Sequence, residues 1–137
     1  MTPTRFTIAY WCLLFAALLP VICAGIAKWG MFKVPPKDGG YDNNNPRSWL
    51  ARQSGWRARA NAAQGNTFEV LPFFFAAVII AHTLGARQAL LDVACVFWLM
   101  LRVAYIILYV GDMAAIRTAV WTLALVLNIV ILFLGFR

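Results

Sequence analysis

Charged side chains are scarce in this chain of 137 residues. Only 12% of the residues are charged, whereas 63% are hydrophobic, and 5 acidic residues stand against 12 lysines and arginines. A soluble domain of this length could not hide so much apolar surface, because a small globule buries only part of its chain. The composition therefore argues against a soluble globular domain and predicts that lipid covers much of the surface.

Cysteine and histidine are also sparse. Cys12, Cys23 and Cys95 all lie inside apolar runs, with no CxxC and no metal-type spacing, and His82 is the single histidine. An odd number of cysteines argues against a disulfide framework, and cysteine in such runs acts as a small hydrophobic residue. The basic excess forms no compact patch interleaved with aromatic residues. We therefore expect neither a metal site nor a nucleic-acid partner.

What the sequence has in abundance is long apolar runs. Four of them, at about residues 6–28, 66–85, 89–110 and 117–136, have the length that crosses about 30 Å of hydrocarbon. They lack the period-two alternation of barrel strands, and lipid otherwise admits only helices. We predict one all-α domain over residues 1–137, an integral-membrane four-helix bundle. A cleaved signal peptide is the alternative for the first run, but its apolar core is longer than is typical.

Basic residues concentrate in the connection between the first two runs, about residues 29–60, and at its edges. The opposite side of the predicted bundle carries Arg5, Arg87 and Arg137. The positive-inside bias places the long connection in the cytoplasm. Both termini would then lie on the periplasmic side of a bacterial inner membrane. The basic residues of the connection are Lys28, Lys33, Lys37, Arg47, Arg52, Arg57 and Arg59.

Arg102 interrupts the third apolar run, within "FWLMLRVAYIILYVGD". An arginine at the centre of a membrane helix costs about 2.5–3.5 kcal/mol on the insertion scale. Such a residue ordinarily faces the interior of the bundle and has a partner. Glu69, near the same end of the second run, is the candidate, so we expect an ion pair between the two helices. A purely structural clamp is the alternative interpretation.

Other polar residues share the helix faces of this pair. Tyr105 and Tyr109 follow Arg102 at i+3 and i+7, and Asn66 lies one turn before Glu69. Each of the two helices therefore presents a polar stripe toward the same end of the bundle.

A second arginine, Arg117, begins the fourth run, with Thr118 beside it. Arginine binds carboxylates in bidentate fashion, and asparagine can satisfy both partners of a peptide amide. The cluster would suit a small anionic, peptide-like ligand, with a lipid-soluble second molecule arriving between helices. A polar network that only holds the bundle together is the alternative.

Two segments, "AAQGNTFEVLPFF" and "RVAYIILYVGDMAAIR", resemble the MAPEG family, the membrane-associated proteins in eicosanoid and glutathione metabolism. The upstream "YDNNNPRSWLARQSGWRARA" resembles the bacterial branch of that family. The combination of Asn-x-x-Glu-x-x-Pro, Arg-x6-Tyr and a following arginine is specific only as a set. The resemblance implies a homotrimer of four-helix subunits, with glutathione as cosubstrate near the cytoplasmic face between adjacent subunits.

The same resemblance implies a role for each matching residue. Arg117 would stabilise the glutathione thiolate, the reactive form of a thiol whose pKa is otherwise about 8.5, and Thr118 would hydrogen-bond the sulfur. Tyr105 replaces a histidine of prostaglandin E synthase, so that isomerase activity is not expected. The residues expected to bind glutathione or to clamp the site are Asn66, Glu69, Arg102, Tyr105 and Tyr109.

The chain also departs from the family. Several members have basic residues where this chain has Ala62 and Gly65. Arg59 or Arg57 would have to reach in from the segment before the second run. We expect a glutathione-dependent transferase or peroxidase acting on hydrophobic electrophiles. The alternative is a non-catalytic membrane protein that binds a lipophile or a partner. A small transporter is less favoured, because the charges gather at one face.

Overall fold

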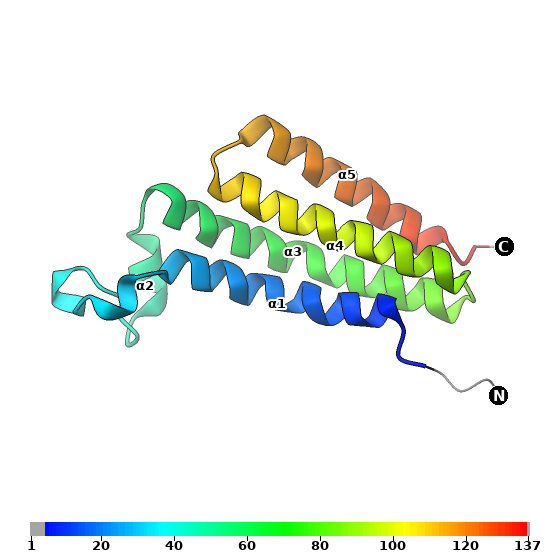
Figure 1. Cartoon of the computed structure of the whole chain (residues 1–137), viewed down its shortest axis with the longest axis horizontal. Helices are drawn as coiled ribbons and strands as arrows, with labels where there is room; N and C mark the ends of the chain where they lie inside the picture. Colours follow the sequence, from blue (N-terminus) through cyan, green and yellow to red (C-terminus); the bar gives the residue numbers. More distant parts are fainter. Residues whose placement is uncertain (1–4, 137) are drawn as a thin grey trace.

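The computed structural model describes residues 5–136, most of which belong to four long helices that lie side by side (Figure 1). No strand occurs among these described residues, so the predicted all-α four-helix architecture is confirmed. A short helix, α2 (Pro46–Ala51), and two single 3-10 turns, η1 (Met31–Lys33) and η2 (Pro36–Asp38), lie in the connection after the first long helix. The long helices are α1 (Ile8–Lys28), α3 (Gly55–Thr83), α4 (Gln88–Val110) and α5 (Ala114–Phe133).

The long helices run side by side along the long axis of the molecule, and consecutive ones are antiparallel (Figure 1). α1 and α5 lie on opposite sides of the central α3–α4 pair, and each packs on both of these helices. The connection containing α2 and the turn between α4 and α5 lie at one end of the bundle. The α3–α4 turn, the start of α1 and the end of α5 lie at the other end.

All four long helices are long and apolar enough to cross a membrane. Many of their large apolar side chains remain exposed, among them Phe15, Val93, Ile107 and Val126. Exposed apolar surface on this scale indicates contact with lipid or with another chain. The protein is therefore a multi-pass membrane protein. Arg137, which the sequence places on the periplasmic side, lies outside the described residues.

The core contains small residues where α1 meets α3 and stacked aromatic residues where α3 meets α4. Ala9 and Ala16 of α1 and Ala77 of α3 are fully buried, which allows close approach of the two helices. Between α3 and α4, Phe74 stacks on Trp98 with a centroid distance of 3.6 Å and an interplanar angle of 6°. This stacked pair fixes α3 against α4 next to the polar residues described below.

α3 begins at Gly55, well before the start expected for the second apolar run, and continues through Pro72. The segment with Arg57 and Arg59 is thus the first part of a membrane helix. The connection before it is organised around Trp49, which is buried and donates from Nε1 to the Gly39 carbonyl at 3.1 Å.

Candidate functional site between α3, α4 and α5

Arg102 of α4 points into the bundle and is only 1% exposed. Its Nη2 donates to Asn66 Oδ1 at 3.0 Å and to Thr67 Oγ1 at 3.2 Å, and both acceptors belong to α3. The guanidinium also lies 4.2 Å from the ring centroid of Tyr105, one turn further along α4. The interior position predicted for Arg102 is therefore observed, with polar groups of α3 as its partners.

Glu69 is not the direct partner of Arg102. Among residues 5–136 the one ion pair joins two other residues, and Glu69 instead accepts from Asn66 Nδ2 at 3.5 Å. The expected ion pair is thus replaced by a relay from Glu69 through Asn66 to Arg102. The relay forms because an asparagine amide offers a donor on one side and an acceptor on the other. Glu69 itself stays exposed.

Thr67 was not among the predicted site residues. Its side chain is fully buried, donates to the Ala63 carbonyl at 2.7 Å and accepts the bond from Arg102. A threonine hydroxyl that bonds the carbonyl four residues earlier is common in helices, and no spacing in the sequence singled it out. Its position next to Asn66 was the one available signal.

A cavity of about 200 Å³ opens beside this cluster, and we call it the outer cavity. Arg117 reaches it from the first turn of α5, and its guanidinium lies 4.1 Å from the ring centroid of Tyr109. Tyr109 in turn meets Tyr105 edge to face, with a centroid distance of 5.6 Å. The cavity is lined by Asn66, Tyr105, Arg117, Thr118 and Trp121.

The two arginines of this region differ in their partners. Arg102 is held by two hydrogen bonds, whereas Arg117 has only the Tyr109 ring and forms no ion pair within the described chain. A half-exposed guanidinium without a carboxylate partner can attract an anion. Thr118, the neighbour of Arg117, is exposed and donates its hydroxyl to the Ala114 carbonyl at 3.0 Å. It would have to turn away from that carbonyl to donate to a ligand.

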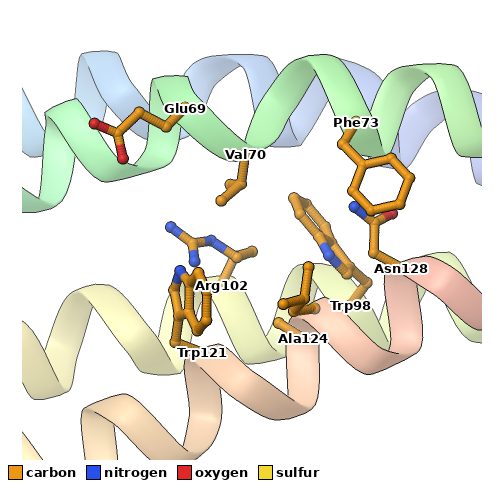
Figure 2. A pocket seen from close by; sticks show the side chains of 9 residues that line it. Glu69, Val70, Phe73, Trp98, Arg102, Trp121, Ala124 and Asn128 are labelled. Atoms are coloured by element: carbon orange, nitrogen blue, oxygen red, sulfur yellow. The ribbon is translucent and has the colours of Figure 1, made fainter.

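A second pocket of about 160 Å³ lies deeper between α3, α4 and α5, and we call it the inner pocket (Figure 2). Trp121 lines both the inner pocket and the outer cavity, so the two are adjacent. Neither Trp121 nor Asn128 was a predicted site residue. With Arg117 they share the spacing of one helix face, which was the signal present in the sequence. The inner pocket is lined by Glu69, Val70, Phe73, Trp98, Arg102, Trp121, Ala124, Leu125 and Asn128.

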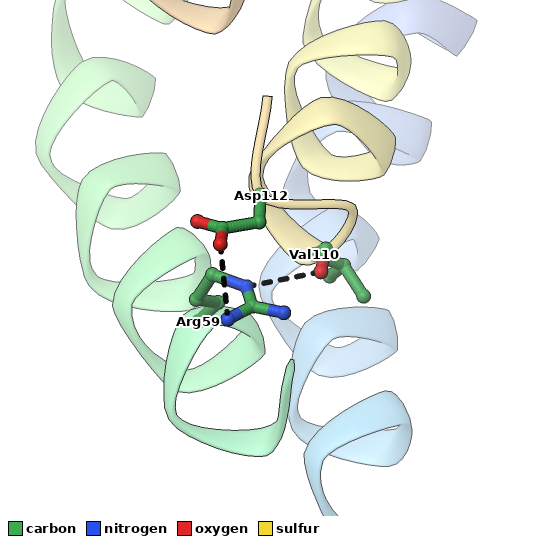
Figure 3. A network of polar contacts seen from close by, with 3 residues as sticks. All are labelled: Arg59, Val110 and Asp112. Carbon is green, nitrogen blue, oxygen red and sulfur yellow. Dashed lines mark hydrogen bonds and ion pairs between the residues drawn. The ribbon is translucent and has the colours of Figure 1, made fainter. Parts of the chain in front are cut away.

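Arg59 does not line either of these spaces. Figure 3 shows its guanidinium directed at the turn after α4, where Nε donates to the Val110 carbonyl at 3.1 Å. Nη1 lies 3.8 Å from Asp112 Oδ2. Arg57 is engaged in a similar way, donating to the Ala27 carbonyl at the end of α1 at 2.9 Å. Within one chain, neither arginine replaces the basic residues absent at positions 62 and 65.

The fold and the site together define a class: a four-helix membrane protein with a polar site that joins three helices at one end of the bundle. The sequence model of the MAPEG family matches residues 8–137, nearly the whole chain, and the chain belongs to that family. It is thus a membrane protein of the family associated with eicosanoid and glutathione metabolism. No curated protein and no solved structure gives a significant match to the chain.

Proposed function

We propose that this protein is an integral-membrane glutathione-dependent transferase or peroxidase acting on hydrophobic electrophiles. The observation that carries the proposal is Arg117, a guanidinium without a carboxylate partner in the described chain, at the wall of the outer cavity. Family membership supports glutathione as the cosubstrate.

The chemistry follows from the charge of Arg117. A free thiol has a pKa of about 8.5, and a nearby guanidinium stabilises the thiolate, which is the nucleophile. Because Arg117 is stacked on Tyr109 and not neutralised by an acid, its positive charge is available to the sulfur. Asn66 offers its amide and Glu69 an exposed carboxylate to the peptide part of glutathione.

One chain supplies only part of the proposed site. Ligand pockets usually measure about 300–1,000 Å³, whereas the outer cavity measures about 200 Å³. A tripeptide with two carboxylates would also exceed what one unneutralised arginine can hold. Both facts support a homotrimer in which a neighbouring subunit completes the site. The exposed apolar faces of the helices supply surface for that assembly as well as for lipid.

The electrophile is expected to be a hydrophobic small molecule that reaches the site from the membrane. The inner pocket supports this, because most of its lining residues are apolar or aromatic and it adjoins the outer cavity at Trp121. The same apolar lining would also serve the alternative function, a non-catalytic protein that binds a lipophile. The two functions differ in whether the protein ionises glutathione.

The test is the ultraviolet band of the thiolate. Purified protein in detergent, mixed with millimolar glutathione at neutral pH, should develop this band, and Arg117→Ala should abolish it. Arg117→Lys should retain part of the band, because the charge remains while the stacking on Tyr109 changes. Arg47→Ala, which removes an exposed cation from the connection, is the matched control. A full band in Arg117→Ala would refute the role of Arg117. Absence of the band in the unmodified protein would favour the non-catalytic function.

A further inference from the structure

Asn128 of α5 is a buried polar residue without a partner. It is 2% exposed, its amide forms no hydrogen bond with any described residue, and its Oδ1 is completely enclosed. Arg102 shows a related feature, because its Nε is also enclosed and unpartnered while Nη2 is bonded. Buried polar groups in folded proteins are nearly always hydrogen-bonded. Each of these two groups therefore lacks a hydrogen-bonding partner that a bound molecule could supply.

Both groups face the same space, since Arg102 and Asn128 line the inner pocket. Figure 2 shows Arg102 toward one end of the pocket and Asn128 toward the other, with Trp98 and Ala124 between them. Aromatic rings form much of the remaining wall, including those of Phe73 and Trp121. The pocket is thus an apolar, aromatic space with a hydrogen-bonding group near each end.

The size of the pocket limits what fits. Its volume is about 160 Å³, and an apolar cavity of about 150 Å³ is known to bind benzene. A single aromatic ring with one polar substituent therefore fits, whereas a long lipid tail would not fit inside. The aromatic walls favour a ring, because stacked and edge-to-face contacts add to the burial of apolar area.

We propose that the inner pocket binds a single-ring aromatic molecule that carries a hydroxyl group, with the hydroxyl bound by Asn128. A hydroxyl both donates and accepts, so it satisfies the Asn128 amide whichever way that amide is turned. Such a molecule would lie against Trp121, next to the cavity in which Arg117 is placed. The inference goes beyond the proposed function and does not rest on it, because this binding needs no glutathione and a hydroxyl-bearing ring is not itself an electrophile.

The experiment compares phenol with toluene, which have nearly the same size and differ in the hydroxyl. Each is titrated, without glutathione, into the purified full-length protein and into Asn128→Leu, and the dissociation constant is measured from the fluorescence of the tryptophans. We expect phenol to bind about tenfold more weakly to Asn128→Leu, the loss of one hydrogen bond. Toluene should bind the variant as well as the unmodified protein or better. Partition into detergent is the same for both proteins and cancels in this comparison.

A matched control is Thr122→Leu, which changes an exposed polar residue of α5 outside the pocket and should leave phenol binding unchanged. Equal phenol affinities of Asn128→Leu and the unmodified protein would overturn the proposal. So would saturable binding of neither ligand, which would mean that water or a neighbouring subunit completes the pocket. Toluene binding by Asn128→Leu reports that the variant is folded, and the thiolate band of the unmodified protein tests the proposed function separately. An intact thiolate band in the unmodified protein together with no phenol binding to that same protein would refute this inference and leave the proposed function standing.

Discussion

At the scale of single residues, the arginine inside the bundle decides how the site is built. A charged side chain in the middle of a membrane helix is unfavourable by about 2.5–3.5 kcal/mol on the insertion scale. Arg102 offsets this cost through two oxygen acceptors on α3 and the face of Tyr105. Because Asn66 is one of these acceptors, the bond that stabilises Arg102 also fixes the orientation of an amide at the outer cavity.

The buried threonine should therefore matter more than an ordinary helical threonine. We expect Thr67→Val to lower the free energy of unfolding by about 1.5–3 kcal/mol, the range for a hydrogen bond to a charged group. Thr83→Val is the matched control, because each hydroxyl donates to the carbonyl four residues earlier at 2.7 Å but Thr83 is exposed and has no arginine. Thr83→Val should change the free energy of unfolding by no more than about 0.5 kcal/mol. Thermal unfolding in detergent measures both.

A second comparison tests the cause of that loss. If Thr67 acts through the arginine, adding Arg102→Leu to the Thr67→Val variant should lower the free energy of unfolding by less than Arg102→Leu does in the unmodified protein. The effects of substituting two residues that share a hydrogen bond are not additive. Additive effects would show that the threonine and the arginine do not stabilise each other, in conflict with the 3.2 Å bond between them.

Residue spacing predicted part of this site and missed part of it. The apolar surroundings of Arg102 required an interior position, and the one-turn spacing grouped Asn66 with Glu69, as the structure has them. Spacing could not decide whether the amide or the carboxylate would reach the guanidinium, because that depends on side-chain rotamers and on the rotation of α3 about its axis. Thr67 and Asn128 were not assigned to the site, because their signals, adjacency to Asn66 and a helix face shared with Arg117, are weak on their own.

At the scale of helices and turns, two arginines in the first part of α3 hydrogen-bond the C-terminal ends of α1 and α4 and so clamp them. The last carbonyl groups of a helix lack partners within the helix and carry partial negative charge. Arg57 donates to such a carbonyl of α1 and Arg59 to one of α4. The α4–α5 turn also contains Asp112, whose φ of +63° is unusual for a residue other than glycine. The clamp by Arg59 thus holds the turn that leads to Arg117.

Removing this clamp should weaken the turn by a modest amount. We expect Arg59→Gln to lower the free energy of unfolding by about 1–2 kcal/mol, since a charge-assisted bond to a helix end is lost. Asp112→Asn should cost less than about 1 kcal/mol, because the side chain of Asp112 is 73% exposed and such ion pairs contribute little. Arg47→Gln, at an exposed position where the arginine side chain makes no hydrogen bond or ion pair within the described chain, should have no effect. Thermal unfolding of the three variants would show this order, and a larger loss in Asp112→Asn than in Arg59→Gln would contradict it.

The helices themselves were the more predictable part of the fold. Their apolar runs are long, and lipid leaves few alternatives for such segments. The connection between α1 and α3 was harder to predict, because its order depends on contacts between distant residues. Trp49 is buried, with a hydrogen bond to the Gly39 carbonyl and an edge-to-face contact with Tyr41 at 5.3 Å. Local composition rich in proline, glycine and asparagine predicts turns but not the tryptophan around which they fold.

At the scale of the whole molecule, charge and polarity gather at one end of the bundle. The basic connection, the α4–α5 turn and the outer cavity all lie near this end, whereas the α3–α4 turn, the start of α1 and the end of α5 lie at the other (Figure 1). The positive-inside bias predicts that the basic end faces the cytoplasm. The proposed glutathione site would then open toward the cytoplasm of a bacterial cell, with both termini in the periplasm.

Chemical labelling can test this orientation, because Cys12, Cys23 and Cys95 are all buried and should react slowly. Lys37→Cys would place an accessible thiol at the basic end, and Arg87→Cys one at the opposite end, since both positions are exposed. In intact spheroplasts a membrane-impermeant maleimide should label Arg87→Cys and leave Lys37→Cys unreacted. In inverted membrane vesicles the pattern should reverse, and the unsubstituted protein should stay unlabelled in both. Labelling of Lys37→Cys in spheroplasts would place the outer cavity on the periplasmic side, away from the compartment in which the proposed reaction is expected.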